Sequence, residues 1–184
     1  QILHRVVDAA VYLASAEQGA LMLVDSHQKE LVIRAAKNFD EKIARTLRLP
    51  TSDGVAGDVF RTGKSVNLGG EQQTKIKTSF LVRAVLYVPL NVRDEVIGVL
   101  TVDNQLTSRC FTQRHQRLLE AMADYAAIAI RNAQLLTELQ ARNAELESDA
   151  SAAVVHYPAQ YAAARARLGD DDPLKVLGHV DHEV

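Results

Sequence analysis

Side chains that could bind a metal or act as a nucleophile are sparse in this 184-residue chain. His27 and His115 are candidate ligands for a metal or haem, but neither has a second His, Cys or acidic residue at ligand spacing. The single cysteine, Cys110, excludes an internal disulfide and a CxxC redox pair. We therefore expect solvated histidines, no metal site and no cofactor.

Catalytic groups are equally hard to assemble from the sequence. Asp53, Asp58 and Asp103 do not form an obvious acid/base pair, and no set of nucleophile, base and orienting residue stands out. The two glycines of Gly54-Val55-Ala56-Gly57 are typical of a phosphate loop, but no Lys-Ser/Thr follows them and no strand directly precedes them. These glycines favour close packing of a helix against its neighbours. We therefore predict no catalytic residues and no enzyme activity.

The composition narrows the class of protein further. The chain is 47% hydrophobic and 24% charged, which are ordinary values for a globular protein. A net charge of -2 and the lack of a basic patch argue against nucleic-acid binding. No apolar run approaches the ~20 residues of a membrane span, and no signal peptide opens the chain. We expect a cytoplasmic segment of a longer protein, because the chain begins at Gln1 without Met.

The elements that must position any site are organised around a predicted β-hairpin. Residues 85–92 and 96–102 are rich in β-branched and aliphatic side chains, with Arg93-Asp94 as the turn. Counting outward from that turn pairs Gly98 with Pro89 and makes both faces apolar. One face then carries Leu86, Val88, Leu90, Ile97, Val99 and Thr101, and the other carries Val85, Tyr87, Pro89, Val96, Gly98, Leu100 and Val102. Two apolar faces indicate central strands that are covered on both sides.

Shorter elements precede the hairpin. We predict a helix over residues 1–16 with Leu3, Val6, Ala10 and Leu13 on its apolar face and Ile2 and Val7 widening it, followed by strands at 20–25 and 30–37. The second strand should place Leu31, Ile33 and Ala35 on one face. A short helix at 41–46, a helix at 55–62, an edge strand at 65–68 and a mobile loop at 69–77 follow. Ser52 or Asp53 should begin the second of these helices, and Gly63 should end it.

A long helix follows the hairpin, from a cap at Thr112 to about Asp149. Its heptad seam contains Leu118, Met122, Tyr125, Ala129, Leu136, Leu139 and Leu146, with Asn132 and Asn143 at the remaining positions. The second half is apolar along this seam alone, so it needs a partner helix. We predict a parallel homodimer with interface residues Leu3, Val6, Leu136, Leu139, Asn143 and Leu146.

This order of elements predicts an α+β fold, a three-layer α/β/α sandwich with a mostly antiparallel central sheet and a long C-terminal helix. The chain resembles the GAF domain in ALMLVD with LVIRAAK, in DGVAGDVFRTGKSVNL, in AVLYVPLNVRDEVIGVLTVDNQ and in FTQRHQRLLEAMADYAAIAIRNAQL. We assign residues 1–149 to this domain. Residues 150–184 would be a linker or the start of a downstream effector domain, with a few letters similar to either a sensor kinase or a diguanylate cyclase.

The resemblance implies a non-catalytic regulatory module of a signalling protein, usually dimeric, that binds a small ligand between the sheet and the middle helices. Some members bind nothing and only pair, so a dimerisation connector is the alternative. Members that bind cyclic nucleotides carry an Asn-Lys, Phe, Asp-Glu pattern; residues 38–41 are similar in letters, but no Asn-Lys pair precedes them. Bilin-binding members use a Cys followed by His, whereas Phe111 follows Cys110 here. The members that reduce methionine sulfoxide need several cysteines.

We expect the ligand under the thin second cover of the sheet. Phe60 on the middle helix, the edge strand and the end of the polar loop would surround it, and the charge of Arg83 would suit an anion. The candidate ligand-binding residues are Phe60, Asn67, Leu68, Thr78, Phe80 and Arg83. The alternative is that Phe60 and Phe80 simply fill this space.

Overall fold

The computed structural model describes residues 2–25, 27, 29–75 and 81–168. These residues form an α+β sandwich whose six-stranded antiparallel sheet has the strand order β3-β2-β1-β6-β5-β4, so the predicted fold class is confirmed. The elements are α1 (Ile2–Ala14), β1 (Gln18–Asp25), β2 (Glu30–Lys37), α2 (Glu41–Thr46), β3 (Arg48–Pro50), α3 (Gly54–Thr62), β4 (Val66–Lys75), β5 (Leu81–Val92), β6 (Glu95–Asn104) and α4 (Gln113–Leu168).

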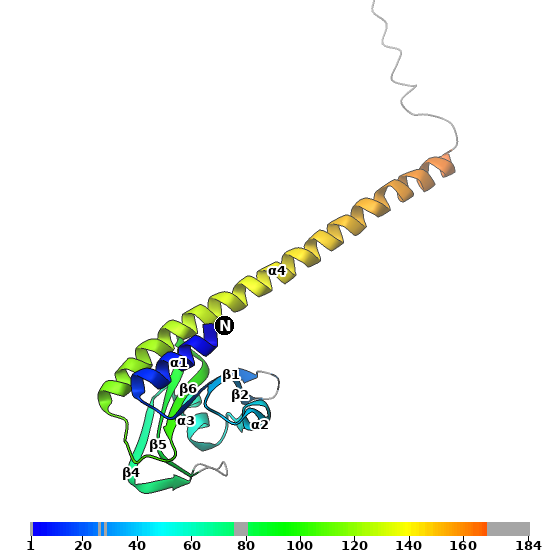
Figure 1. Ribbon diagram of the computed structural model, residues 1–184. Helices are drawn as coiled ribbons and strands as arrows, with labels where there is room; N and C mark the ends of the chain where they lie inside the picture. The colour runs from blue at the N-terminus through cyan, green and yellow to red at the C-terminus, as the bar shows by residue number, and fades with distance from the viewer. Residues whose placement is uncertain (1, 26, 28, 76–80, 169–184) are drawn as a thin grey trace, which may run out of the picture. The chain divides into compact units, whose positions relative to one another are not determined.

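The chain divides into two compact units, residues 1–133 and residues 134–184. The first unit contains the whole sheet together with α1, α2, α3 and the beginning of α4 (Figure 1). The second unit contains the remainder of α4, which continues to Leu168. The predicted end of this helix near Asp149 is therefore wrong; residues 150–168 include eight alanines, and Ala is the strongest helix former.

Each face of the sheet carries its own core. In Figure 1, α1 and the start of α4 lie side by side on one face, and α2 and α3 lie on the other. The first core joins Val7 and Val11 of α1, Leu86 of β5, and Leu119 and Ala123 of α4. The second core joins Met22, Leu31, Val59, Val85 and Val99 among others. Each cover removes an apolar face from water, which is the main stabilising term of such a sandwich.

The buried stripe of α1 differs by a small rotation from the predicted one. Its buried residues are Val7, Ala10, Val11 and Ala14, whereas Leu13 is exposed. Small side chains at Ala10 and Ala14 let the helix backbone approach the sheet closely. The larger Leu13 and Tyr12 are left on the outer side.

The predicted hairpin is confirmed in its turn but not in its register. Arg93 adopts the left-handed conformation that a tight turn requires, with φ 56°. Asn91 pairs with Val96, but the preceding residue of β5, Leu90, pairs with Gly98. Ile97 is therefore an extra residue on β6. This β-bulge reverses the predicted faces of all later β6 residues, since side chains alternate with period two. Gly98 therefore pairs with Leu90 and not with Pro89.

Two further strand predictions need correction for related reasons. Leu21 pairs with Ala35 but Met22 pairs with Ile33, so Arg34 is an extra residue of β2. As a result Ala35 joins the core beneath α1, while Leu31 and Ile33 lie on the opposite face.

The edge strand is also longer than expected: β4 continues to Lys75, with an irregular register between Gly69 and Thr74, where a mobile loop was predicted. The last two loop positions, 76 and 77, lie outside the described residues.

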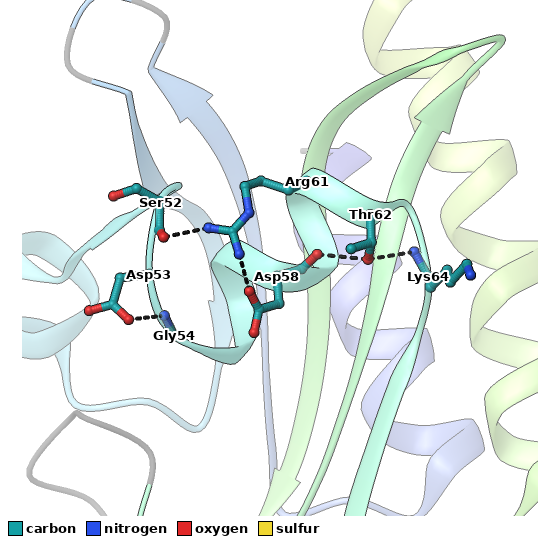
Figure 2. Close-up of polar contacts among 7 residues, drawn as sticks. All are labelled: Ser52, Asp53, Gly54, Asp58, Arg61, Thr62 and Lys64. Atoms are coloured by element: carbon teal, nitrogen blue, oxygen red, sulfur yellow. Dashed lines mark hydrogen bonds and ion pairs between the residues drawn. The ribbon is translucent and has the colours of Figure 1, made fainter.

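Local signals at helix ends are confirmed. Asp53 begins α3 by accepting the Gly54 N–H at 2.7 Å (Figure 2). Gly63 ends the helix at φ 63°. Thr112 and His115 cap α4 reciprocally: the His115 N–H donates to Thr112 Oγ1, and the Thr112 N–H donates to His115 Nδ1, both at 3.3 Å. This is a capping box in which His takes the place of the usual Glu.

Candidate functional site

A cavity of about 70 Å³ lies between the sheet and the segment that contains α2. Strands β1, β2, β5 and β6 provide its floor, and residues 39–49 provide the cover. Most of its walls are apolar. The lining residues are Ala20, Met22, Ile33, Phe39, Ile43, Leu47, Leu49, Val82, Val85, Tyr87, Thr101, Asp103 and Gln105.

Hydrogen bonds from Asn38 and to Asp40 hold the cover in place. Asn38 adopts φ 59°, and its Nδ2 donates to the Glu17 carbonyl oxygen at 2.8 Å, which turns the chain from β2 toward Phe39. Asp40 Oδ1 then accepts the N–H groups of Lys42 at 2.9 Å and Ile43 at 3.1 Å and so begins α2. These contacts hold the segment from which Phe39, just before α2, and Ile43, on α2, line the cavity, although α2 has no buried residue of its own.

One corner of the cavity is polar. Tyr87 of β5 pairs with Thr101 of β6, and Asp103 lies two residues further on the same face. Thr101 is 6% exposed and Asp103 is 5% exposed. Among the described residues, Thr101 Oγ1 and Asp103 Oδ1 have no hydrogen-bond partner. Buried polar atoms without a partner are rare and costly, so this corner calls for a specific explanation.

The buried corner has unusual protonation behaviour. Burial and, next, the negative charge of Glu17 raise the pKa of Asp103 to about 6, with a hydrogen bond to the Gln105 side chain acting in the opposite direction. Burial and the charge of Asp103 also raise the pKa of Tyr87 above its usual value, and the nearby Thr101 hydroxyl, which lies outside hydrogen-bond geometry, acts in the opposite direction. Tyr87 therefore stays protonated, whereas Asp103 changes charge near neutral pH.

Glu17 organises the turn that leaves this corner. Its carboxylate accepts the N–H groups of Gln105 at 2.8 Å, Leu106 at 2.9 Å and Thr107 at 2.8 Å. Partial burial pushes the pKa of Glu17 upward, but these hydrogen bonds outweigh that effect and lower the pKa to about 2. The fully buried Asn104 accepts the Glu17 N–H at 3.0 Å and donates to the Arg109 carbonyl at 2.7 Å. The end of β6 is thereby tied to the start of β1.

The residues that the sequence suggested for ligand binding lie outside this lining. Phe60 and Leu68 pack against the second core, on the face of the sheet that carries α3. Asn67 Nδ2 donates to the Phe111 carbonyl at 3.0 Å, and Arg83 Nη1 donates to Ser108 Oγ at 3.1 Å. Thr78 and Phe80 lie outside the described residues. The structure therefore brings Phe60 and Leu68 into one cluster and leaves Asn67 and Arg83 with other partners.

Sequence reasoning missed Thr101 and Asp103 because it assigned β6 the wrong register. A count from the turn placed Thr101 on the same face as Leu86 and Val88, whereas the extra residue Ile97 moves it to the face of Tyr87, which lines the cavity. A signal was present all the same. Polar residues at positions 101 and 103 alternate with Val102 at the end of an otherwise apolar strand, which is typical of side chains that face a site.

The predicted dimer residues fall into two groups. Leu3 and Val6 pack partly against the first core. Leu136, Leu139 and Leu146 are all more than half exposed, and Asn143 is exposed as well. Exposed leucines at heptad spacing are typical of a surface that pairs with another helix.

The described residues contain no group of three His, Cys, Asp or Glu side chains that could hold a metal ion. None of their helices combines the length and apolarity that crossing a bilayer requires.

The chain is similar to known proteins over most of the first unit. A family model described as GAF domain matches residues 1–131. The chain is 26% identical over 155 residues to the probable 3',5'-cyclic phosphodiesterase pde-5 of Caenorhabditis elegans, and 27% identical over 161 residues to the dual 3',5'-cyclic-AMP and -GMP phosphodiesterase 11 of Drosophila melanogaster. These matches cover 76% and 74% of this chain but only 21% and 11% of the relatives.

A solved structure shows the same fold. The second GAF domain of DevS from Mycobacterium smegmatis superposes with a TM-score of 0.65 at 22% identity, covering 75% of this chain and 96% of that one.

Proposed function

The chain belongs to the GAF domain family of regulatory modules, and from this premise we propose that it is a non-catalytic, cytoplasmic sensor module. In this proposal it works as a homodimer, binds a small ligand in the cavity between the sheet and α2, and transmits the change through α4 to an effector domain. The observation that carries the proposal is the apolar cavity with a buried corner of Tyr87, Thr101 and Asp103, two of whose oxygens have no partner among the described residues.

The corner is connected to both helices that cover the other face of the sheet. Asp103 leads directly into Asn104 and the turn that Glu17 holds, and Glu17 follows α1 in the chain. Beyond the turn, Phe111 is buried in the first core at the start of α4. A ligand that changes the position of Asp103 would therefore act on a hydrogen-bonded segment that ends at α4. Such coupling needs two arrangements of the paired helices, each with a different affinity for the ligand.

The exposed leucines of α4 support the homodimer. Leu136, Leu139 and Leu146 continue the spacing of the seam that begins at Leu118, and an isolated amphipathic helix gains little stability by itself. A parallel pairing would bring the two effector attachment points together. The second candidate function, a dimerisation connector that binds no ligand, rests on this same feature.

A thermal-shift screen of metabolites and nucleotides on the full 184-residue chain tests the proposal. The phosphodiesterase names of the relatives make 3',5'-cyclic AMP and GMP natural members of the compound set. Two variants separate the candidate sites: Thr101→Val alters the cavity, and Asn67→Ala alters the site predicted from the sequence. A compound that raises the melting temperature of the wild type and of Asn67→Ala, but not of Thr101→Val, binds the cavity. If no compound stabilises the wild type while the dimer forms, the connector function replaces the sensor function.

A further inference from the structure

We propose that the cavity selects a small molecule with an apolar body and an N–H donor, neutral or cationic, and that it discriminates against anions. This inference rests on the proposed function and specifies the chemistry of its ligand. Three observations support it. They are the polar oxygens that face the cavity, the lack of positively charged side chains among its described lining residues, and its small volume.

The first observation is the pair of unpartnered oxygens. An ionised carboxylate only accepts hydrogen bonds, and a hydroxyl accepts as well as donates. Thr101 Oγ1 and Asp103 Oδ1 both lie in the lining and lie two residues apart on the same strand. A ligand N–H group placed between them would satisfy buried acceptors that otherwise lose their hydration without compensation. An anionic group would instead approach the carboxylate of Asp103, which already experiences the negative charge of Glu17.

The second observation is the distribution of positive charge and free N–H groups. Among the lining residues that the structure describes, none is a Lys, Arg or His. The N–H groups at the start of α2, the other usual partner of an anion, already donate to Asp40, and Gly54 N–H of α3 donates to Asp53. The described part of the wall therefore offers a phosphate or carboxylate no cationic side chain, and the N–H groups of Lys42 and Ile43 at the start of α2 are already bonded to Asp40.

The remaining polar groups favour an amide or an amine. Tyr87 lines the same corner and keeps its hydroxyl proton, because burial raises its pKa. Gln105 contributes an amide that both donates and accepts at the edge of the lining. A carboxamide would give its N–H to Asp103 or Thr101 and accept from Tyr87 or Gln105, whereas an ammonium group would pair with the carboxylate.

The third observation is size. A volume of about 70 Å³ is well below the roughly 300–1,000 Å³ of pockets that hold drug-sized ligands. Phe39, Ile43 and Leu49 line the cavity with apolar side chains from the cover. A body of a few carbon atoms with one polar head fits this space better than a nucleotide with its ribose and phosphate.

Three probes of one shape test the inference: isobutyramide, isobutylammonium and isobutyrate, titrated into the isotope-labelled 184-residue chain while backbone amide resonances are recorded. We expect isobutyramide and isobutylammonium to shift the resonances of Ile43, Thr101 and Asp103. Isobutyrate should bind at least about tenfold more weakly. It has no N–H group to donate, so it would leave the buried acceptors Thr101 Oγ1 and Asp103 Oδ1 unpaired.

Variants locate the interaction. Thr101→Val should weaken isobutyramide binding by about tenfold, the loss expected for one buried hydrogen bond. Asp103→Asn should weaken isobutylammonium more than isobutyramide, because it removes the charge and keeps the shape. Asn67→Ala is the matched control and should leave all three affinities unchanged. Thermal melts show whether each variant folds, and the ranking of the three probes on the wild type decides the question without any variant.

The outcomes separate the inference from the function on which it rests. If isobutyrate binds as well as isobutyramide at the same resonances, the ligand class is wrong and the cavity remains a binding site. If none of the three probes shifts any cavity resonance at millimolar concentration, and the metabolite screen finds no stabilising compound, the cavity is not a ligand site and both proposals fail.

Discussion

The backbone N–H of Glu17 donates to the carbonyl oxygen of Asp103 at 3.2 Å, which joins two acidic residues from the start of β1 and the end of β6. The two carboxyl groups have opposite surroundings. Glu17 accepts three backbone N–H groups, whereas Asp103 Oδ1 has no partner among the described residues. Their pKa values accordingly move apart, to about 2 for Glu17 and about 6 for Asp103. Because the two pKa values differ, the pH dependence of the free energy of unfolding reports on each carboxyl group separately.

Asp103→Asn should stabilise the protein at neutral pH. A carboxyl group whose pKa is raised in the folded state lowers stability as pH rises from its unfolded pKa of 3.8 to about 6. The groups that face Asp103 are Glu17, Tyr87, Thr101 and Gln105, and only Glu17 carries a charge in this range. We expect the variant to raise the free energy of unfolding by about 1–3 kcal/mol at pH 8 and to change it little at pH 3.5. Urea denaturation at both pH values measures this, and an equal effect at the two would contradict the buried carboxylate.

Glu17→Gln should have the opposite effect. Its lowered pKa means that the ionised carboxylate contributes stability above pH 4.5, and that this contribution is lost as pH falls toward 2. Loss of its charged hydrogen bonds to the turn should cost about 1–2 kcal/mol at pH 7. Carboxyl NMR titration supplies a second readout: the pKa of Asp103 should fall in this variant, because the charge of Glu17 helps to raise it. An unchanged Asp103 titration would show that burial alone sets its pKa.

Gly98→Ala should be strongly destabilising, because Gly98 has no room for a side chain. A Cβ at this position would collide with the Met22 carbonyl oxygen and lie 2.9 Å from Leu23 Cδ2 and 3.1 Å from Leu90 Cδ1. Two central strands would have to separate, so we expect a loss of about 3 kcal/mol or more. Gly54→Ala is the control: nothing lies within 4 Å of its Cβ, and only its φ of 75° opposes the change. Similar losses in the two variants would show that the close contact between β1 and β6 relaxes easily.

Leu139→Asp should weaken the homodimer much more than Arg142→Asp. Leu139 is 59% exposed in one chain and lies on the heptad seam, whereas the exposed Arg142 lies off it. A carboxylate in an apolar seam loses its hydration without gaining a partner. With two copies in each dimer we expect the dissociation constant to rise by about 100-fold or more for Leu139→Asp and by less than about tenfold for Arg142→Asp. Sedimentation over a concentration series measures both constants, and equal effects would disprove the heptad assignment.

Cys110→Ser should leave the fold and the ligand response unchanged. Cys110 is exposed, and its Sγ makes a long 3.7 Å contact to the Ser108 carbonyl oxygen. A serine hydroxyl keeps that contact, so the melting temperature should shift by less than about 2 °C, as for other exposed substitutions. Differential scanning calorimetry with and without a stabilising compound provides the comparison. Loss of a bound colour or of the ligand response in the variant would show that the thiol has a role.

The elements that depend on neighbouring residues were predictable from the sequence. Asp53 and Gly63 mark the ends of α3, Arg93-Asp94 forms the hairpin turn, and α2 spans the residues at which a short helix was expected. Each of these signals acts over three or four residues, through a side chain that caps a helix or a backbone that tolerates a positive φ. The apolar character of both hairpin faces likewise predicted a sheet covered on two sides, and the two cores confirm it.

Only the tertiary structure decided which side chains of the sheet face the cavity. The extra residues Ile97 and Arg34 are bulges that arise where three strands adjust to one another, and no local sequence signal marks them. Because side chains alternate along a strand, one extra residue moves every later side chain to the other face. Thr101 and Asp103 reach the cavity in this way, and Phe39, more than 60 positions earlier in the chain, lines the same cavity. The composition and periodicity of the sequence determined which elements form, whereas the register between strands determined the site.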